Sequence, residues 1–256
     1  MATWIFLRGL TRESRHWGGF VEQFQSAFPG QTIVPIDFAG NGLQNHRPSA
    51  SCVQDMVEDC RAQLAQRNIS GPCHVLAMSL GAMVAVAWAE GYPHEVAAQV
   101  LINTSMRPFN PFYQRLQPAN YATLLWLALS RATPAAWERA ILRMTSNRGN
   151  TTVLTRWVQL RQSNPVSVIN ALRQLFAAAR FMARSIAPAR PTLLLASAQD
   201  HLVSVACSRS LAQHWQCSLR MHPDAGHDLP LDDGPWVATQ VRQWLASWGE
   251  QAHDLP

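Results

Sequence analysis

One serine, Ser79, stands where a strand-like run turns directly into a helix. Apolar residues 74–77 precede it, and strong helix formers follow over residues 82–90. Ala77 and Gly81 flank the serine at a distance of two residues on either side. Small residues are needed there, because the turn is tight and a larger side chain would collide with the neighbouring strand or helix. A small-x-Ser-x-small sequence between a strand and a helix is the nucleophile-elbow pattern, which predicts a reactive serine.

A serine hydroxyl is a weak nucleophile at neutral pH, so a base must lie within hydrogen-bond reach. His227 is the candidate base, because it follows a glycine in a loop after the last predicted strand. The base needs a carboxylate that holds its tautomer, and Asp200 is the candidate because it follows the end of a predicted strand. The backbone N–H groups of Leu10 and Leu80 are the candidates for an oxyanion hole.

Several residues compete for these roles. Ser79 could be a plain helix N-cap, although that would not explain the small residues around it. The other candidate acids are Asp228, Asp232 and Asp233. The first is adjacent to the base and so points elsewhere, while the other two resemble helix-entry residues before a proline. We expect His222 and Asp37 to be structural, and His201 to be a loop residue that could line a pocket. No histidine–carboxylate cluster stands at metal spacing and no glycine-rich phosphate loop is present, so we expect no metal, no nucleotide and no cofactor.

Strand-like and helix-like segments alternate along most of the chain. The predicted strands are residues 4–7, 32–36, 74–77, 99–103, 191–197 and 217–221, and the predicted helices are 16–27, 52–67, 82–90 and 236–248. This alternation predicts a parallel sheet covered by helices on both faces. Residues 104–185 contain helical segments and no convincing strand. The predicted organisation is therefore a core of residues 1–103 and 186–256, interrupted by a helical cap at 104–185.

Five motifs in this order resemble those of the α/β-hydrolase family. They are Arg8-Gly9 in place of its His-Gly oxyanion loop, residues 37–42 (DFAGNG) as its D-x-P-G-x-G loop, Ala77-Met78-Ser79-Leu80-Gly81 as the elbow, Ala198-Gln199-Asp200 after a strand, and Gly226-His227-Asp228. The order Ser, Asp, His is the one this family uses. The resemblance implies an α/β-hydrolase fold with a mostly parallel sheet, helices on both faces and a helical cap inserted before the last two strands. Compared with full-length members, the chain begins so close to the oxyanion strand that the first two strands are expected to be missing.

The resemblance also implies a serine hydrolase that cleaves a carboxylic ester, or a related acyl bond, through an acyl-enzyme. Thioesterases, C–C bond hydrolases and acyltransferases share the fold, so these activities stay open. A non-catalytic ligand receptor on a hydrolase scaffold is the alternative from another class. The aromatic and aliphatic side chains of the cap predict walls of an apolar acyl pocket, with Trp126 and His201 as candidate substrate-binding residues.

Composition sets wider limits. With 48% hydrophobic residues among 256, the chain can bury a sizeable core. The N-terminal run lacks a basic region and Arg8 cuts it short, so it predicts a first strand rather than a signal peptide. The apolar stretch at 121–129 is too short to cross a bilayer, so no transmembrane segment is expected. Five cysteines without a C-x-x-C pair favour free thiols in a reduced cytoplasm.

Charge is divided unevenly along the chain. All 21 basic residues are arginine, and residues 104–185 hold 11 of them against a single acid, Glu138. A solvated surface in an arginine-rich proteome would explain the arginines but not the exclusion of acids. Clustered charge attracts an anionic partner, such as an acyl group on an acidic acyl carrier protein or on coenzyme A. In this respect the chain is similar to the pimeloyl-carrier-protein methyl esterase type of the family. We expect no nucleic-acid partner. Binding to a membrane surface stays open, although the chain has no obvious amphipathic anchor.

Overall fold

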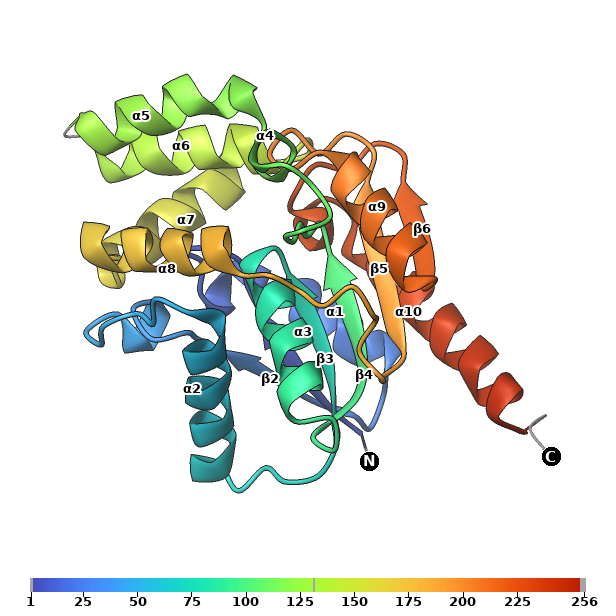
Figure 1. The fold of residues 1–256 in the computed structure, drawn as a ribbon. Helices are drawn as coiled ribbons and strands as arrows, with labels where there is room; N and C mark the ends of the chain where they lie inside the picture. The colour runs from blue at the N-terminus through green and yellow to red at the C-terminus, as the bar shows by residue number, and fades with distance from the viewer. Residues whose placement is uncertain (1, 131, 254–256) are drawn as a thin grey trace.

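A single parallel sheet forms the centre of the computed structural model, which describes residues 2–130 and 132–253 (Figure 1). The strands within those residues are β1 (Thr3–Leu7), β2 (Thr32–Ile36), β3 (Cys73–Met78), β4 (Val96–Ile102), β5 (Thr192–Ser197) and β6 (Ser218–His222). They lie in the order β2-β1-β3-β4-β5-β6, and every neighbouring pair is parallel. The α/β architecture predicted from the sequence is therefore confirmed.

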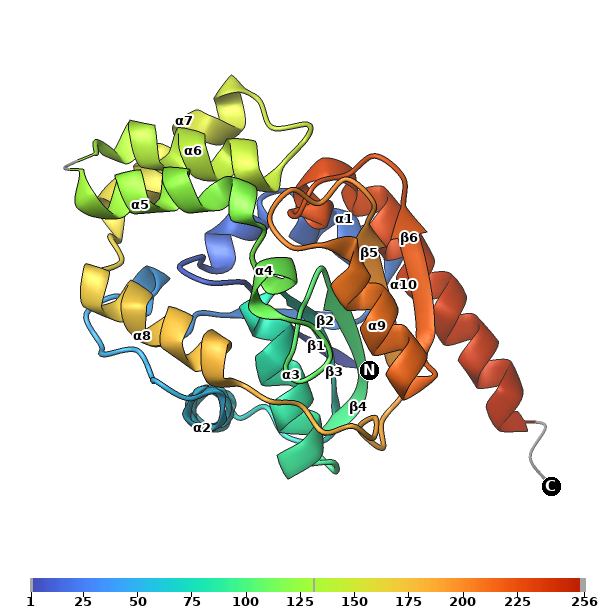
Figure 2. The same cartoon turned by 45° about the horizontal axis from the view of Figure 1, so that its top comes forward.

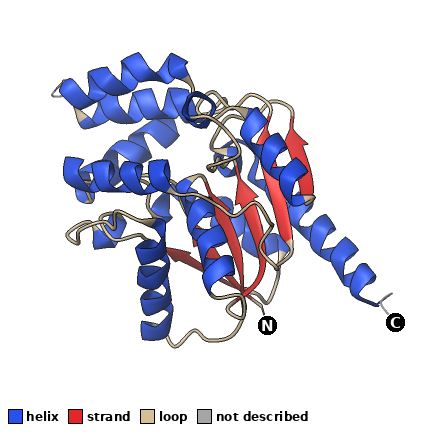
Figure 3. Cartoon of the chain, in the orientation of Figure 1, coloured by secondary structure: helices blue, strands red, loops and turns tan. Residues whose placement is uncertain are grey.

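Helices cover both faces of this sheet, as Figure 3 shows for the whole chain. One face packs against α1 (Phe20–Ala27) and α10 (Leu229–His253), and the other against α2 (Val53–Gln66), α3 (Leu80–Gly91) and α9 (Val205–Trp215). β1 shows why the central strands are largely apolar. Its Trp4 and Phe6 enter the first layer of the core, while Ile5 and Leu7 enter the second. A strand buried on both faces has no polar side to show, so its sequence reads as a continuous apolar run.

Three helical segments differ from the sequence prediction. The predicted helix 16–27 is divided into a 3-10 turn, η1 (Ser14–Trp17), and α1, because Gly18 adopts a φ of 54° that ends the first turn. The predicted helix 236–248 begins earlier, within α10, which is interrupted at Asp233. The helix α9 was not predicted, since its buried residues are few and are separated by small and polar side chains.

Residues 104–185, hereafter the helical insertion, connect β4 to β5. Their helices are α4 (Phe112–Arg115), η3 (Pro118–Asn120), α5 (Tyr121–Leu129), α6 (Pro134–Thr145), α7 (Thr151–Ser163) and α8 (Val168–Arg180). Figures 1 and 2 show α5, α6 and α7 as one group beyond the carboxyl ends of the strands, with α8 set apart above α2. No described residue of the insertion belongs to a strand, although Arg107 and Met182 form an isolated bridge. None of the described helices has both the length and the hydropathy of a bilayer span.

Candidate active site

The carboxyl ends of the strands converge on one edge of the sheet. The register pairs Leu7 of β1 with Ala77 of β3, and Met78 of β3 with Ile102 of β4. It also pairs the last residue of β5 with the last residue of β6. The segments that follow these strands therefore start side by side, and this is the edge where open α/β sheets collect their functional groups.

Ser79 occupies a strained turn at this edge. Its φ of 55° and ψ of −117° lie outside the regions that side chains favour, so the turn must be held by its surroundings. The Ser79 N–H donates to the carbonyl of Ile102 at 3.0 Å, and the Thr104 hydroxyl donates to the Ser79 carbonyl at 3.1 Å. A Cβ at Gly81 would lie 2.5 Å from the Leu7 carbonyl oxygen, so only glycine lets α3 approach β1 this closely. The small residue of the motif thus has the steric role expected from the sequence.

The predicted base and the predicted acid are in contact. His227 Nδ1 lies 2.7 Å from Asp200 Oδ2, and both side chains are buried. The other carboxylate oxygen of Asp200 accepts hydrogen bonds from the N–H groups of Leu202 and Val203, at 2.8 and 2.9 Å. Both oxygens are therefore fixed, and the carboxylate orients one nitrogen of the imidazole.

Asn103, which the sequence did not single out, connects the end of β4 to the end of β5 and to the loop that carries His227. It follows β4 directly and has a φ of 44°. Its side-chain nitrogen donates to the His227 carbonyl at 2.7 Å, and its side-chain oxygen accepts from the Ser197 N–H at 2.8 Å. The signal in the sequence is a polar residue immediately after a buried strand. The hydrogen bonds show that Asn103 fixes the loop that carries the histidine.

Two backbone N–H groups flank Ser79. Leu80 is the first residue of α3, so its N–H has no partner within the helix. Leu10 lies in the loop after β1, where Gly9 approaches so closely that its Cβ would stand 3.1 Å from the Ser79 Cβ. Within the described residues no acceptor is hydrogen-bonded to the Leu10 N–H. Leu80 therefore begins the helix at the serine turn, and the loop that carries Leu10 approaches the same turn through Gly9.

The side chain of Arg8 points away from this turn into a buried ion pair. Its Nη1 and Nη2 atoms lie 3.0 and 2.5 Å from the two carboxylate oxygens of Asp228, and both residues are 2% exposed. Its guanidinium also lies over the ring of Trp17, at 4.7 Å. Asp228 is bound by arginine on both oxygens, so it is not the partner of the neighbouring histidine.

The remaining two acidic candidates, and the two residues expected to be structural, have partners outside the Asp200–His227 pair. Asp232 accepts hydrogen bonds from the N–H groups of Gly226 and Asn147, at 2.7 and 2.9 Å. Asp233 caps the second part of α10 by accepting from the Trp236 N–H at 3.0 Å. Asp37 accepts from the N–H groups of Ser14 and Leu43 in its turn. His222 Nε2 lies 3.2 Å from Asp233 Oδ2. All four hold loops near the sheet edge.

The two candidate substrate-binding residues lie at the surface. Trp126 projects from α5 with 54% of its side chain exposed, and His201 is exposed beside Asp200. Trp126 belongs to a wider set of exposed apolar residues on α4, α5 and α8, namely Phe112, Tyr113, Tyr121, Leu125, Trp126, Leu129, Val168, Ile169, Leu172, Leu175 and Phe176. The exposed apolar residues on these three helices are candidates for a binding surface.

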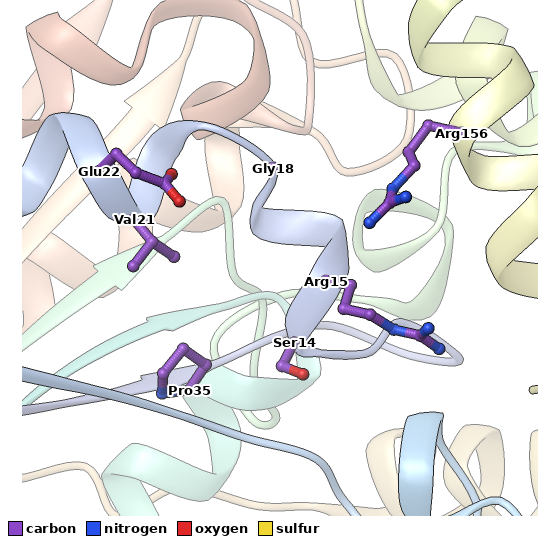
Figure 4. Close-up of a pocket in the computed structure, with 7 residues that line it drawn as sticks. All are labelled: Ser14, Arg15, Gly18, Val21, Glu22, Pro35 and Arg156. Carbon is purple, nitrogen blue, oxygen red and sulfur yellow. The ribbon is translucent and has the colours of Figure 1, made fainter.

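A separate surface cleft of about 550 Å³ lies beside η1, α1 and β2 (Figure 4). Arg156 of α7 reaches toward it from one side, while Ser14, Arg15 and Glu22 line the other. None of the predicted catalytic residues lines this cleft, so it is not the space next to Ser79.

No group of three or more His, Cys, Asp or Glu residues that could hold a metal occurs in residues 2–130 and 132–253. The cysteines of these segments form no disulfide. Burial raises the pKa of the Cys207 thiol to about 12 and that of Cys217 to about 11. These thiols stay protonated at neutral pH, which makes them poor nucleophiles.

Comparison with known proteins places the chain in a family. The family model described as serine aminopeptidase, S33, matches residues 2–234. The chain belongs to this α/β-hydrolase family. A search of curated proteins found no match to this chain.

Three solved structures illustrate the shared fold. One is BpoC from Mycobacterium tuberculosis H37Rv, which has been assigned provisionally as a non-heme bromoperoxidase. It has a TM-score of 0.77 and 24% identity, and the match covers 96% of the present chain and 92% of BpoC. An esterase from Thermogutta terrifontis has a TM-score of 0.75 and 19% identity, with 96% and 90% covered. An enol-lactonase from Burkholderia xenovorans LB400 has 0.76 and 16%, with 96% and 91% covered. At these identities the likeness is one of fold.

Proposed function

We propose that this chain is a serine hydrolase that cleaves carboxylic esters through an acyl-enzyme, with Ser79 as nucleophile, His227 as base and Asp200 as the carboxylate that orients the base. The contact of 2.7 Å between Asp200 and His227, on the sheet edge that also carries the strained Ser79 turn, is the observation that supports this most. Asp200 and His227 lie more than a hundred positions after Ser79 in the sequence, yet all three follow strands that end at the same edge of the sheet, which supports a shared role in acyl transfer.

The proposed reaction proceeds in two halves. His227 takes the hydroxyl proton as the Ser79 oxygen bonds to the ester carbonyl carbon, and the N–H groups of Leu10 and Leu80 stabilise the oxyanion. The C–O bond to the alcohol then breaks, and the imidazolium gives its proton to the leaving oxygen. Water attacks the acyl-enzyme with the same base, and the acid leaves as Ser79 regains its proton. Asp200 keeps its negative charge throughout and stabilises the imidazolium.

The helical insertion acts as a cap that binds the acyl chain. The exposed apolar residues of α4, α5 and α8, including Trp126, supply the contact area that an aliphatic chain needs, at about 0.8 kcal/mol per buried methylene. Esters with longer acyl chains should therefore be better substrates. The same groups could attack a thioester, so thioesterase activity is the alternative that the test must separate.

The test is a set of nitrophenyl esters of increasing chain length, together with a fluorophosphonate label. We expect labelling at Ser79, and a kcat/KM that rises with chain length. A matching thioester and an aminoacyl nitroanilide separate thioesterase and peptidase activity from ester hydrolysis. Absence of labelling together with absence of turnover on every substrate would favour a ligand receptor on a hydrolase scaffold.

A second candidate is hydrolysis of an ester whose acyl chain is attached to an anionic carrier, either an acidic acyl carrier protein or coenzyme A. The only acid of the insertion in the sequence, Glu138, is fully buried. Arg139, Arg143 and Arg156 are exposed, and within the described residues they form no hydrogen bond or ion pair. Positive charge without local compensation favours encounter with an acidic partner.

Comparison of a carrier-bound ester with the same free ester, at low and high salt, tests this candidate. Carrier attachment should raise kcat/KM, and salt should remove much of the gain because it screens the charges. The variant pair Arg139→Gln/Arg143→Gln should lose the gain, while Arg220→Gln on β6 is the matched control. Equal rates with both esters at every ionic strength would contradict the hypothesis that the substrate is bound to a carrier.

A further inference from the structure

The loop that carries the Leu10 N–H has an unusual backbone. It leaves β1 at Arg8, and the Arg12 N–H donates to the Gly9 carbonyl at 3.1 Å to close a turn. Thr11 within this turn has a φ of 58°. The left-handed region is a genuine outlier for a β-branched residue, and such strain persists only where neighbouring groups hold it.

A buried glutamine of the helical insertion supplies one of those groups. Gln174 of α8 is 0% exposed, and its side-chain oxygen accepts a hydrogen bond from the Thr11 N–H at 2.8 Å. Its side-chain nitrogen donates to the side-chain oxygen of Asn41 at 2.7 Å and to the Ser49 hydroxyl at 3.0 Å. Asn41 in turn donates to the Arg12 carbonyl at 2.8 Å. The strained residue is thus held on both sides through one glutamine.

A buried glutamate of the insertion holds the side chain that follows. Glu138 of α6 is also 0% exposed, and its Oε2 lies 2.7 Å from Arg12 Nη1. Its other oxygen accepts from Arg161 at 3.1 Å. The Arg12 guanidinium stacks over Trp157 of α7 at 4.2 Å. Two separate helices of the insertion, α6 and α8, therefore reach the same short loop through fully buried polar side chains.

We infer that Gln174 and Glu138 are positioning residues for the oxyanion hole, so that the insertion aims the Leu10 N–H as well as covering the site. The inference rests on the proposed function, because it assigns these residues a part in the same reaction. The Gln174 hydrogen bond fixes the peptide unit between Leu10 and Thr11, which is next to the unit that carries the Leu10 N–H. If the strain at Thr11 relaxed, the N–H vector would rotate away from the developing oxyanion.

Such an effect has a specific kinetic signature. An oxyanion-hole donor acts on charge that exists only in the transition state, so its displacement lowers kcat more than it changes KM. Loss of one donor outright costs about 10²–10³ in kcat, which sets the upper limit for a donor that is only misdirected. A trifluoromethyl ketone forms a hemiketal oxyanion on the serine, whereas an unreactive alcohol of the same chain length does not. The two inhibitors therefore separate oxyanion stabilisation from ground-state binding.

The matched variants lie one turn apart on α8. Gln174→Met keeps the side-chain length but removes the acceptor for Thr11, while Gln174→Glu keeps an acceptor oxygen. Asn170→Leu is the control, since Asn170 is equally a buried polar residue of α8 but bonds the Ser49 N–H and the Arg47 carbonyl. We expect Gln174→Met to lower kcat and ketone affinity by the same factor, of about 10 to 100. Alcohol affinity should stay unchanged and Gln174→Glu should recover much of the loss.

Asn170→Leu should lose thermal stability to a similar degree and keep kcat near wild type. The inference fails if Gln174→Met keeps wild-type kcat, or if Asn170→Leu loses as much kcat as Gln174→Met. Where Gln174→Met does not fold, Glu138→Gln with the same two inhibitors decides the question, because it weakens the hold on Arg12 with little change in shape. Failure of the proposed function looks different: Ser79→Ala would then keep wild-type turnover.

Discussion

The carboxyl edge of the sheet and the helical insertion are built on different physical terms. At the edge, backbone register and apolar burial place Ser79, Asp200 and His227, with hydrogen bonds of 2.7–3.1 Å between neighbouring strand ends. Within its described residues, the insertion has a small apolar cluster formed by Leu142, Trp157 and Leu160. It joins the core through a few buried polar contacts and a few buried apolar residues near its two ends, and it leaves much of its apolar surface exposed.

The two regions meet different requirements: the sheet edge must hold reacting groups precisely, whereas the insertion must offer surface for binding substrate. Reacting groups must be held within a fraction of an ångström, which a close-packed sheet provides. A surface that accepts acyl chains of several shapes gains from exposed side chains on helices that pack loosely. Substitutions at the edge should therefore act on kcat, and substitutions on the exposed face of the insertion on KM.

The largest effect is expected at the serine and the histidine. Ser79→Ala and His227→Ala should each lower kcat by about 10⁶, and the double variant should be no slower than either single one, because the residues act as a unit. Turnover of a nitrophenyl ester, with circular dichroism to verify folding, measures this. Additive losses would show that the two residues do not share one step.

Asp200 and Asp228 should separate a kinetic role from a structural one. Asp200→Asn is expected to lower kcat by about 10⁴ with little loss of stability, because the imidazole takes the wrong tautomer. Asp228→Asn removes the charge paired with buried Arg8 and should lower the free energy of unfolding by about 3 kcal/mol, with a smaller kinetic effect. Urea denaturation and steady-state kinetics on both variants provide the comparison. A larger kinetic loss from Asp228→Asn would mean that the acid is wrongly assigned.

Gly81→Ala tests whether sterics alone fix the serine turn. The new Cβ would meet the Leu7 carbonyl oxygen at 2.5 Å and the Arg8 carbonyl oxygen at 2.6 Å. Since backbone atoms cannot move aside easily, we expect a loss of about 1–3 kcal/mol in the free energy of unfolding, together with reduced kcat. Gly91→Ala, at the other end of α3, is the control, because its Cβ would have no neighbour within 4 Å.

His16 reports on the junction between the core and the insertion. Burial, followed by the charges of Arg12 and Arg8, lowers the pKa of His16 well below its ordinary value of 6.5. The unfolded chain therefore binds a proton before the folded one does, so stability present above about pH 6.5 is lost as the pH falls further. His16→Gln should reduce this loss by up to about 1.4 kcal/mol per pH unit. Denaturation at a series of pH values, with exposed His46→Gln as control, measures the slope.

The smallest effect on stability is expected on the exposed face of the insertion. Leu172→Gln, at a side chain that is 59% exposed, should change the free energy of unfolding by no more than about 0.5 kcal/mol. It should raise KM for long-chain esters and leave kcat and short-chain KM unchanged, because it removes contact area for the acyl chain. Met221→Gln on β6 is the matched control. An equal change of KM for short and long esters would remove Leu172 from the acyl site.

Local patterns of residue types were sufficient to predict several features of this protein. Apolar runs alternating with helix formers predicted the parallel sheet, and the structure confirms it. Small residues around Ser79 predicted a tight turn. The structure has that turn, with a φ of 55° at Ser79 and a close approach of Gly81 to β1. The positions of Asp200 and His227 after strand ends predicted their shared edge, because the ends of parallel strands must meet there.

The partners of distant residues could be identified only from the folded chain. The pairs Arg8–Asp228, Thr11–Gln174 and Arg12–Glu138 join segments more than a hundred residues apart and leave no periodic trace in the sequence. Helix α8 shows the physical reason most directly. Hydrophobic periodicity would turn Leu172 and Phe176 inward, yet the buried side is the one that carries Asn170 and Gln174. Loop N–H and carbonyl groups near the serine need buried polar partners, and that need, set by the fold, decides which face of the helix turns inward.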